Sequence, residues 1–262
     1  MIGIFDSGVG GMTVARAIEQ LCPDYPLIYF GDIARTPYGS KSPETIQRYA
    51  VNNTNFLLDQ GAELIVIACN SAASTALPAL HDQFDLPILD VITPAVQQAV
   101  KVTKNGKIGI IGTRATIKST IYEQGITTRR PGSKVFSQPC PLLVPLVEEG
   151  WLGKRETKMI LRRYLYPLRR HQIDTLVLGC THYPLLKQLI APRIGRRVQL
   201  IDSSVAVART LQSFLAGHAD LAEKLYQPQT KSRFFVSDLT ETAGQLAAHI
   251  FGRFITLEKV NV

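Results

Sequence analysis

Short apolar, β-branched runs recur along the chain, and each is followed by a turn signal and then by a stretch with helical periodicity. The runs are continuous rather than alternating, so both faces of each strand must be covered. Strands of this kind separated by helices predict an α/β fold built on parallel sheets. We expect eight strands, at residues 2–5, 27–30, 64–68, 88–91, 108–111, 134–136, 175–178 and 198–201.

The strand sequences repeat. I-G-I-F-D-S at 2–7 resembles I-G-I-I-G-T at 108–113, and L-I-V-I-A-C-N at 64–70 resembles T-L-V-L-G-C-T at 175–181. Leu89-Asp90 also resembles Ile201-Asp202. The three offsets are nearly equal, which predicts two similar α/β domains related by a pseudo-twofold axis. Ligands of parallel sheets bind beyond the carboxyl ends of the strands. We therefore expect a central cleft lined by Asp6-Ser7, Cys69-Asn70, Thr113 and Cys180-Thr181.

The composition is that of an ordinary globular protein, with 262 residues, 45% hydrophobic and 19% charged. The longest apolar runs fall far short of the roughly 20 residues of a membrane helix. Residues 1–5 run into a polar, Gly-rich turn instead of a secretory signal. We therefore expect a cytoplasmic protein that does not contact membranes. Cys22, Cys69, Cys140 and Cys180 form no C-x-x-C pair, so we expect free thiols and no metal site.

The net charge of +8 is distributed unevenly. Residues 101–200 carry nineteen Lys/Arg and five Asp/Glu, whereas residues 1–100 carry four and ten. Much of the excess lies at 154–171, where basic residues alternate with apolar ones at helical spacing. We interpret this segment as a solvated helix face rather than a nucleic-acid surface, because no binding motif or row of interleaved stacking aromatics accompanies it.

Cys69 and Cys180 occupy equivalent places in the two halves, directly after a strand and before a predicted helix. Each alone is most simply a buried core residue, but a helix N-terminus stabilises a thiolate. Inversion of a carbon centre needs a base on one face and an acid on the other, with the roles exchanged in reverse. A thiolate and a thiol across a cleft meet this need, and Asp6 and His182 are neighbours able to hold their protons. The symmetric pair favours catalysis.

Five motifs, in this order along almost the whole chain, resemble those of the glutamate racemase family, within the aspartate/glutamate racemases. They are D-S-G-V-G-G at 6–11, A-R-T-P-Y-G at 34–39, A-C-N-S at 68–71, V-P-L-V-E-E-G at 144–150 and G-C-T-H-Y-P at 179–184. Related aspartate racemases usually carry Glu where this chain has His182, which favours glutamate as the substrate.

The resemblance implies a cofactor-independent enzyme that makes D-glutamate for peptidoglycan. By similarity, Cys69 takes the α-proton of D-glutamate with the help of Asp6, and Cys180 takes that of L-glutamate with the help of His182. The positions that match substrate-holding residues are Asp6, Ser7, Tyr38, Gly39, Asn70, Ser71, Thr113, Thr116, Glu148, Thr181 and His182.

The resemblance also implies that the C-terminal segment returns to the first half. We expect one domain at 1–95 plus 209–262 and a second at 96–208. The expected partner is the small-molecule substrate, with no metal or cofactor and no nucleic acid. The sequence leaves the oligomeric state open, and a homodimer is one alternative.

Besides a binding protein, either a sensor whose cleft closes on an amino acid or a DNA-associated protein that uses the basic helix, two alternatives to glutamate racemisation remain at this stage. One is a racemase or isomerase of the same superfamily that acts on another acidic substrate. The other is a nucleotide-binding α/β protein, because strand 2–5, the Gly8-Gly10-Gly11 loop and Asp32 imitate a dinucleotide fingerprint. Thr13 stands where that fingerprint has its third glycine, and Asp6 would point a negative charge at the pyrophosphate.

Overall fold

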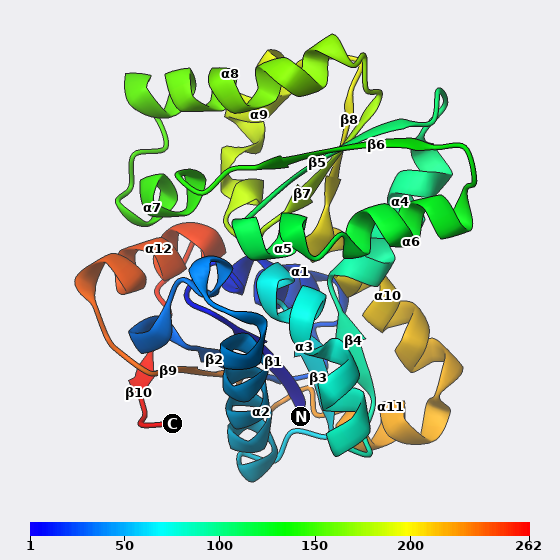
Figure 1. The fold of residues 1–262 in the computed structure, drawn as a ribbon. Helices are drawn as coiled ribbons and strands as arrows, with labels where there is room; N and C mark the ends of the chain where they lie inside the picture. The colour runs from blue at the N-terminus through cyan, green and yellow to red at the C-terminus, as the bar shows by residue number, and fades with distance from the viewer.

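The computed structural model describes residues 1–262 and contains two parallel sheets, one above the other in Figure 1. The six-stranded sheet has the order β10-β9-β2-β1-β3-β4, and the four-stranded sheet has the order β6-β5-β7-β8. The strands are β1 (Ile2–Asp6), β2 (Leu27–Gly31), β3 (Leu64–Ile67), β4 (Ile88–Asp90), β5 (Lys107–Gly112), β6 (Lys134–Pro139), β7 (Thr175–Gly179), β8 (Gln199–Asp202), β9 (Arg233–Val236) and β10 (Glu258–Lys259).

All eight strands expected from the apolar runs are present, so the predicted α/β fold is confirmed. The internal repeat is visible in the strand order. β1 lies between β2 and β3, with β4 beyond β3; β5 lies in the same way between β6 and β7, with β8 beyond β7. The matching sequences at 2–7 and 108–113 therefore form the central strand of each half.

β9 and β10 were not among the expected strands. β9 pairs in parallel with β2, and β10 pairs with β9 at the edge of the first sheet. β10 has two residues, both exposed, and therefore has no apolar run. The apolar run of β9, Phe234–Val236, is no shorter than that of β4, and we overlooked it in the sequence. The C-terminal segment thus returns to the first sheet.

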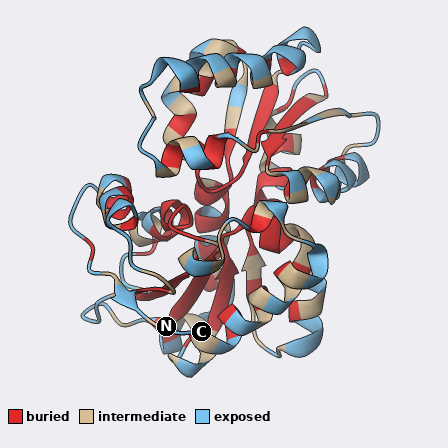
Figure 2. Cartoon of the chain, turned by 60° about the vertical axis from the view of Figure 1, so that its left-hand side comes forward, coloured by how far each residue is buried: buried red, intermediate tan, exposed pale blue.

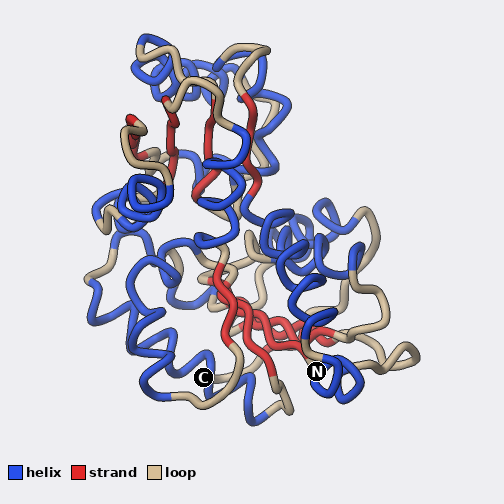
Figure 3. Tube along the Cα trace, turned by 90° about the vertical axis from the view of Figure 1, so that its right-hand side faces the viewer, coloured by secondary structure: helices blue, strands red, loops and turns tan.

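Helices lie on both sides of each sheet, as the blue segments of Figure 3 show. The chain crosses between the sheets at α4 and again at α10, which packs against α1 and α4. The α-helices are α1 (Met12–Leu21), α2 (Pro43–Asp59), α3 (Asn70–Gln83), α4 (Ile92–Val102), α5 (Arg114–Lys118), α6 (Ile121–Arg129), α7 (Leu143–Glu148), α8 (Arg155–Arg170), α9 (Lys187–Ile194), α10 (Ser203–Gly217), α11 (Ala219–Leu225) and α12 (Glu241–Phe251). The 3₁₀ helices are η1 (Ile33–Arg35), η2 (Tyr38–Ser40) and η3 (Tyr183–Leu186).

The hydrophobic core follows the central strands of the two sheets, which are red in the burial view of Figure 2. Every residue of β1, β2, β3 and β7 is buried. This burial explains why these strands read as continuous apolar runs. A rigid pair of sheets fixes where the strand ends, and therefore the loops that follow them, can lie. None of the helices is both long and apolar enough to cross a bilayer.

Asp174 anchors the start of β7, the strand that leads to Cys180. Its carboxylate accepts hydrogen bonds from the Thr103 hydroxyl and from the backbone N–H groups of Lys104 and Asn105, each at 2.7 Å. Partial burial of Asp174 raises its pKa, but these hydrogen bonds outweigh that effect, so the pKa lies below its usual value.

We expect Asp174→Asn to lower the free energy of unfolding by about 1–3 kcal/mol near pH 7, because hydrogen bonds to a charged acceptor are lost. The folded-state pKa is depressed, so the stabilisation is present above the unfolded pKa and disappears as the pH falls through the folded one. Urea unfolding of both proteins across this acid range measures the effect. A difference that stays constant with pH would contradict the assignment to the ionised carboxylate.

Candidate active site

The carboxyl ends of β1, β3, β5 and β7 point to the boundary between the two sheets, and the loops that follow them meet there. We call this boundary the seam. Thr181, after β7, donates its hydroxyl hydrogen to Asp6 Oδ1 at the end of β1, at 3.3 Å. The Ser71 hydroxyl, at the start of α3, lies 2.9 Å from the Thr113 hydroxyl after β5. Residues from all four strand ends are thus brought together.

Cys69 lies directly before α3 and is only 4% exposed. Its Sγ accepts a hydrogen bond from the N–H of Ala72 at 3.5 Å, so the sulfur caps the helix. We expected this position to stabilise the thiolate. Burial acts more strongly, however, and together with the charge of Asp6 it raises the pKa of Cys69 to about 12, against the opposing hydrogen bonds of Ala72 and Ser7. Near neutral pH Cys69 is therefore a thiol.

Cys180 follows β7 and is 6% exposed. It does not begin an α-helix: the 3₁₀ helix η3 starts three residues later, and α9 starts only at Lys187. The predicted equivalence with Cys69 is therefore wrong in this respect. The group that contacts the Cys180 sulfur is a histidine side chain and not a helix N-terminus: Cys180 Sγ lies 3.8 Å from His182 Nδ1.

His182 connects Cys180 to a carboxylate. Its ring is 2% exposed, and Nε2 lies 3.1 Å from Glu148 Oε1 at the end of α7. Burial lowers the pKa of His182, but its hydrogen bonds to Cys180 and Glu148 outweigh burial and hold the pKa well above its usual value. The imidazole is therefore able to keep a proton beside the Cys180 sulfur.

Asp6 is completely buried at the end of β1. Its Oδ2 accepts hydrogen bonds from the N–H groups of Gly8 at 3.1 Å and Gly11 at 3.0 Å. Burial raises the pKa of Asp6, while the charge of His182 and the two N–H donors oppose the rise. Asp6 thus lies between the loop that follows β1 and Thr181, the chain neighbour of Cys180.

The same contacts argue against a nucleotide at this loop. The N–H groups of Gly8 and Gly11, which would have to bind a pyrophosphate, already bind the Asp6 carboxylate. Asp32, the candidate ribose ligand, is fully buried and accepts hydrogen bonds from Tyr38 and Ser237. The structure therefore overturns the dinucleotide alternative.

Tyr38 and Gly39 lie at the seam in different ways. The Tyr38 hydroxyl is fully buried and occupied, since it donates to Asp32 and accepts from Asn53 Nδ2 at 3.0 Å. A ligand could therefore use only the backbone of this residue. Gly39 packs against Thr113 so closely that a Cβ would lie 2.5 Å from the Thr113 Cβ.

Asn70 has one free hydrogen-bonding group. Its Oδ1 accepts from the Tyr122 hydroxyl at 2.7 Å, whereas its buried Nδ2 has no partner. A buried donor without a partner costs free energy of folding. Such a donor is typical of a site where a ligand supplies the missing acceptor. Sequence reasoning missed Tyr122, because α6 carries no motif that marks it. Thr116 adds its hydroxyl, 3.1 Å from that of Thr113, to the same side of the seam.

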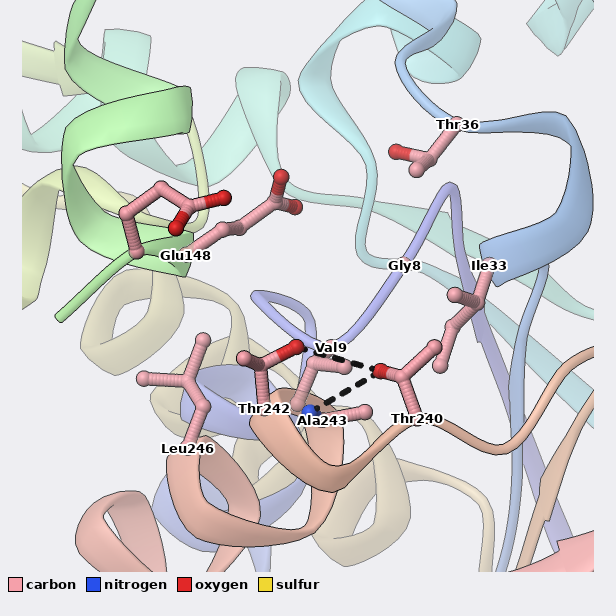
Figure 4. Close-up of a pocket in the computed structure, with 10 residues that line it drawn as sticks. Gly8, Val9, Ile33, Thr36, Glu148, Thr240, Thr242, Ala243 and Leu246 are labelled. Carbon is pink, nitrogen blue, oxygen red and sulfur yellow. Dashed lines mark hydrogen bonds between the residues drawn. The ribbon is translucent and has the colours of Figure 1, made fainter.

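Two pockets open along the seam. The first, of about 190 Å³, is shown in Figure 4. Glu148 enters it from α7, Thr240 and Thr242 line it at the start of α12, and Gly8 lies beside Ile33 on the side across from Glu148. The second, of about 510 Å³, is lined by residues from Gly39 to Pro43 and by α5. The first pocket connects solvent to the carboxylate that contacts His182. No cluster of three or more His, Cys, Asp or Glu side chains is arranged to hold a metal ion.

Comparison with known proteins gives consistent results. The sequence model of the Asp/Glu/Hydantoin racemase family matches residues 9–211. A curated glutamate racemase from Geobacter metallireducens is 45% identical over 241 residues, which cover 91% of this chain and 87% of that protein.

Solved structures agree with this match. A glutamate racemase isoform from Bacillus anthracis superposes with a TM-score of 0.94 at 36% identity and covers 100% of this chain and 97% of its own. The glutamate racemase from Francisella tularensis, solved in complex with D-glutamate, superposes with a TM-score of 0.90 at 35% identity and covers 99% and 97%.

Proposed function

The chain belongs to the Asp/Glu/Hydantoin racemase family and is an amino-acid racemase, an isomerase; from this premise we propose that it interconverts L- and D-glutamate. The names of the similar proteins support glutamate as the substrate. Within the site, the neutral hydroxyl and amide groups of Asn70, Ser71 and Thr113 suit the carboxylates of an acidic amino acid.

The proposed reaction uses the two cysteines as its two bases. In the L-to-D direction the Cys180 thiolate removes the α-proton, and the Cys69 thiol delivers its own proton to the opposite face of the α-carbon. The thiol and thiolate have then exchanged places, and the reverse reaction starts from Cys69. The observation that carries this proposal is the placement of both sulfurs after equivalent strands at one buried seam. Cys180 is the chain neighbour of Thr181, which donates a hydrogen bond to Asp6, and Cys69 is hydrogen-bonded to Ser7, the chain neighbour of Asp6.

Asp6 and His182 serve as partners of the two sulfurs. His182 contacts Cys180 directly and exchanges protons with it, while Glu148 holds the imidazole from the other side. Asp6 approaches Cys69 through Ser7, and its raised pKa allows it to carry a proton. The α-proton of an amino acid is a very weak acid, so exclusion of water and fixed donors are needed to stabilise the charge that develops on the carboxylate.

The remaining predicted residues hold the substrate. Ser7, Asn70, Ser71, Thr113, Thr116 and Thr181 offer hydroxyl and amide donors, and Tyr38 and Gly39 offer backbone groups. The Ser71–Thr113 contact must separate to admit a ligand, so the two sheets have to move apart at the seam. We propose that the moving bodies are residues 1–95 plus 209–262 and residues 96–208. We further propose that the enzyme acts in the cytoplasm and that the D-glutamate it makes is used for peptidoglycan synthesis.

The decisive experiment incubates the purified protein with L-glutamate in deuterated water without added cofactor. We expect D-glutamate to appear by chiral chromatography, with deuterium at its α-position by NMR. Aspartate run in parallel tests the other acidic substrate. Turnover of aspartate without turnover of glutamate would refute the proposed substrate, and racemisation that depends on an added cofactor would refute the mechanism.

Asp6→Asn and His182→Asn should change kcat unequally in the two directions. L- and D-glutamate are enantiomers with equal free energies, so kcat/KM must be the same for both. Different effects of the Asp6 and His182 substitutions on the two directions can therefore appear only in kcat and KM taken separately. We expect His182→Asn to lower kcat mainly for L-glutamate and Asp6→Asn mainly for D-glutamate, each by about 10²–10⁴-fold. Circular dichroism assays in both directions measure this. Equal losses in both directions would show that neither residue serves one sulfur.

A further inference from the structure

A cluster of arginines lies far from the seam, on the helices at the outer end of the second domain. α8 runs along the top of Figure 1, away from the first sheet, and α9 rises to meet it from below. A pocket of about 270 Å³ there is lined by Arg162, Tyr166, Arg169, Arg170 and Arg193. Four guanidinium groups and one phenol ring thus surround one hollow.

The positive charge of this cluster is not compensated within the chain. None of its four arginines belongs to any of the six ion pairs of the structure. Residues 154–197 carry eleven Lys/Arg and only two Asp/Glu, so this segment accounts for the whole net charge of the protein. Like charges at this density repel one another, and an external anion would relieve the repulsion.

Tyr166 adds an exposed aromatic ring to the positively charged pocket. Its side chain is 57% exposed although it is aromatic, and it lies between the arginines one helical turn on either side. Our sequence-based interpretation as a purely solvated face overlooked this residue. An exposed ring beside guanidinium groups offers a platform on which a nucleic-acid base can stack while phosphates bind the arginines.

We propose that this pocket and the exposed face of α8 bind single-stranded nucleic acid. α8 has 16 residues and is therefore about 24 Å long, which is long enough to follow several nucleotides. A single strand is favoured over a duplex because only unpaired bases are free to stack on Tyr166. The cluster is separate from the proposed racemase site, and this inference does not depend on that function.

Fluorescence anisotropy of a labelled oligothymidylate of about 12 nucleotides tests the proposal with the full-length protein. Contact of four arginines with phosphates predicts a slope of about −3 in a plot of log affinity against log salt concentration. Arg169→Gln/Arg170→Gln should flatten the slope by about 1.4. Tyr166→Ala should weaken binding about tenfold and leave the slope unchanged, because stacking releases no ions.

Lys101→Gln/Arg129→Gln is the matched control, since it removes the same charge from exposed positions elsewhere and should leave binding nearly unchanged. Thermal unfolding of each variant verifies that it is folded. The proposal is overturned if wild-type protein does not bind the oligonucleotide, if a duplex binds equally well, or if the control variant loses as much affinity as the arginine variant. It is also overturned if vesicles of anionic phospholipid bind while the oligonucleotide does not.

Discussion

Cys69→Ser and Cys180→Ser should each lower the rate of racemisation by about three orders of magnitude or more, because each removes one of the two groups that move the proton. A serine hydroxyl is a much weaker acid than a thiol and supplies almost no alkoxide near neutral pH. The substitution keeps the side chain nearly the same size, so the buried positions of both residues should remain filled and the fold intact.

The two variants should differ in what they retain. Cys69→Ser keeps Cys180 and should exchange the α-hydrogen of L-glutamate with deuterated water without forming the D-enantiomer. Cys180→Ser should show the mirror behaviour with D-glutamate. NMR of the α-position followed by chiral analysis separates exchange from inversion.

Cys22→Ser is the matched control for both variants. Cys22 is a free thiol and, like Cys69, 4% exposed, but it lies at the C-terminal end of α1 outside the seam. It should therefore keep full activity with a similar small change in stability. Wild-type racemisation by either catalytic-cysteine variant would eliminate the two-thiol mechanism.

Most of the fold could be read from the sequence because its strands are buried on both faces. A buried parallel strand must be apolar throughout, so β1, β3, β5 and β7 stand out in the chain. β10 is exposed and has no apolar run, whereas the apolar run of β9 is as long as that of β4 and was overlooked. β9 is held by pairing with the distant β2, and β10 is held by pairing with β9. Pairing of this kind is not written in the local pattern, and only the family resemblance indicated that the C-terminal segment returns.

In the candidate site, too, the features set by local sequence could be predicted and those set by long-range contacts could not. Residues at strand ends, such as Asp6 and Cys180, follow from the rule that ligands bind beyond the carboxyl ends of parallel strands. The pKa of the Cys69 thiol, in contrast, could not be predicted from the sequence. A helix N-terminus lowers the pKa of a thiol, yet the pKa of Cys69 is raised to about 12, because the closed seam removes the sulfur from water. Whether dipole or desolvation dominates depends on burial, and burial at the seam is created by contacts between residues more than one hundred positions apart, such as Asp6 and Thr181.

Gly10→Ala should lower kcat about 100-fold, because the seam closes against this residue. A Cβ at position 10 would lie 2.5 Å from both Cε1 and Nδ1 of His182 and 2.8 Å from the Thr181 hydroxyl. The His182 ring is buried and held by Cys180 and Glu148, so it cannot move away without losing those contacts. A displacement of about 1 Å in a catalytic group is enough for a loss of this size.

The glycine effect should be specific to closure rather than to stability. Gly244→Ala is the matched control: it lies inside α12, where a Cβ would meet no atom within 4 Å, so it should stabilise the protein by about 0.5–1 kcal/mol and keep full activity. For Gly10→Ala we expect a nearly normal thermal unfolding temperature together with the low kcat, because the clash is confined to the side chains of His182 and Thr181 at the seam and touches no strand of either sheet. Steady-state kinetics and thermal unfolding of the two variants make the comparison. Normal kcat in Gly10→Ala would mean that the loop after β1 withdraws from His182 during turnover, and that direct contact between the two halves at this point is not needed for proton transfer.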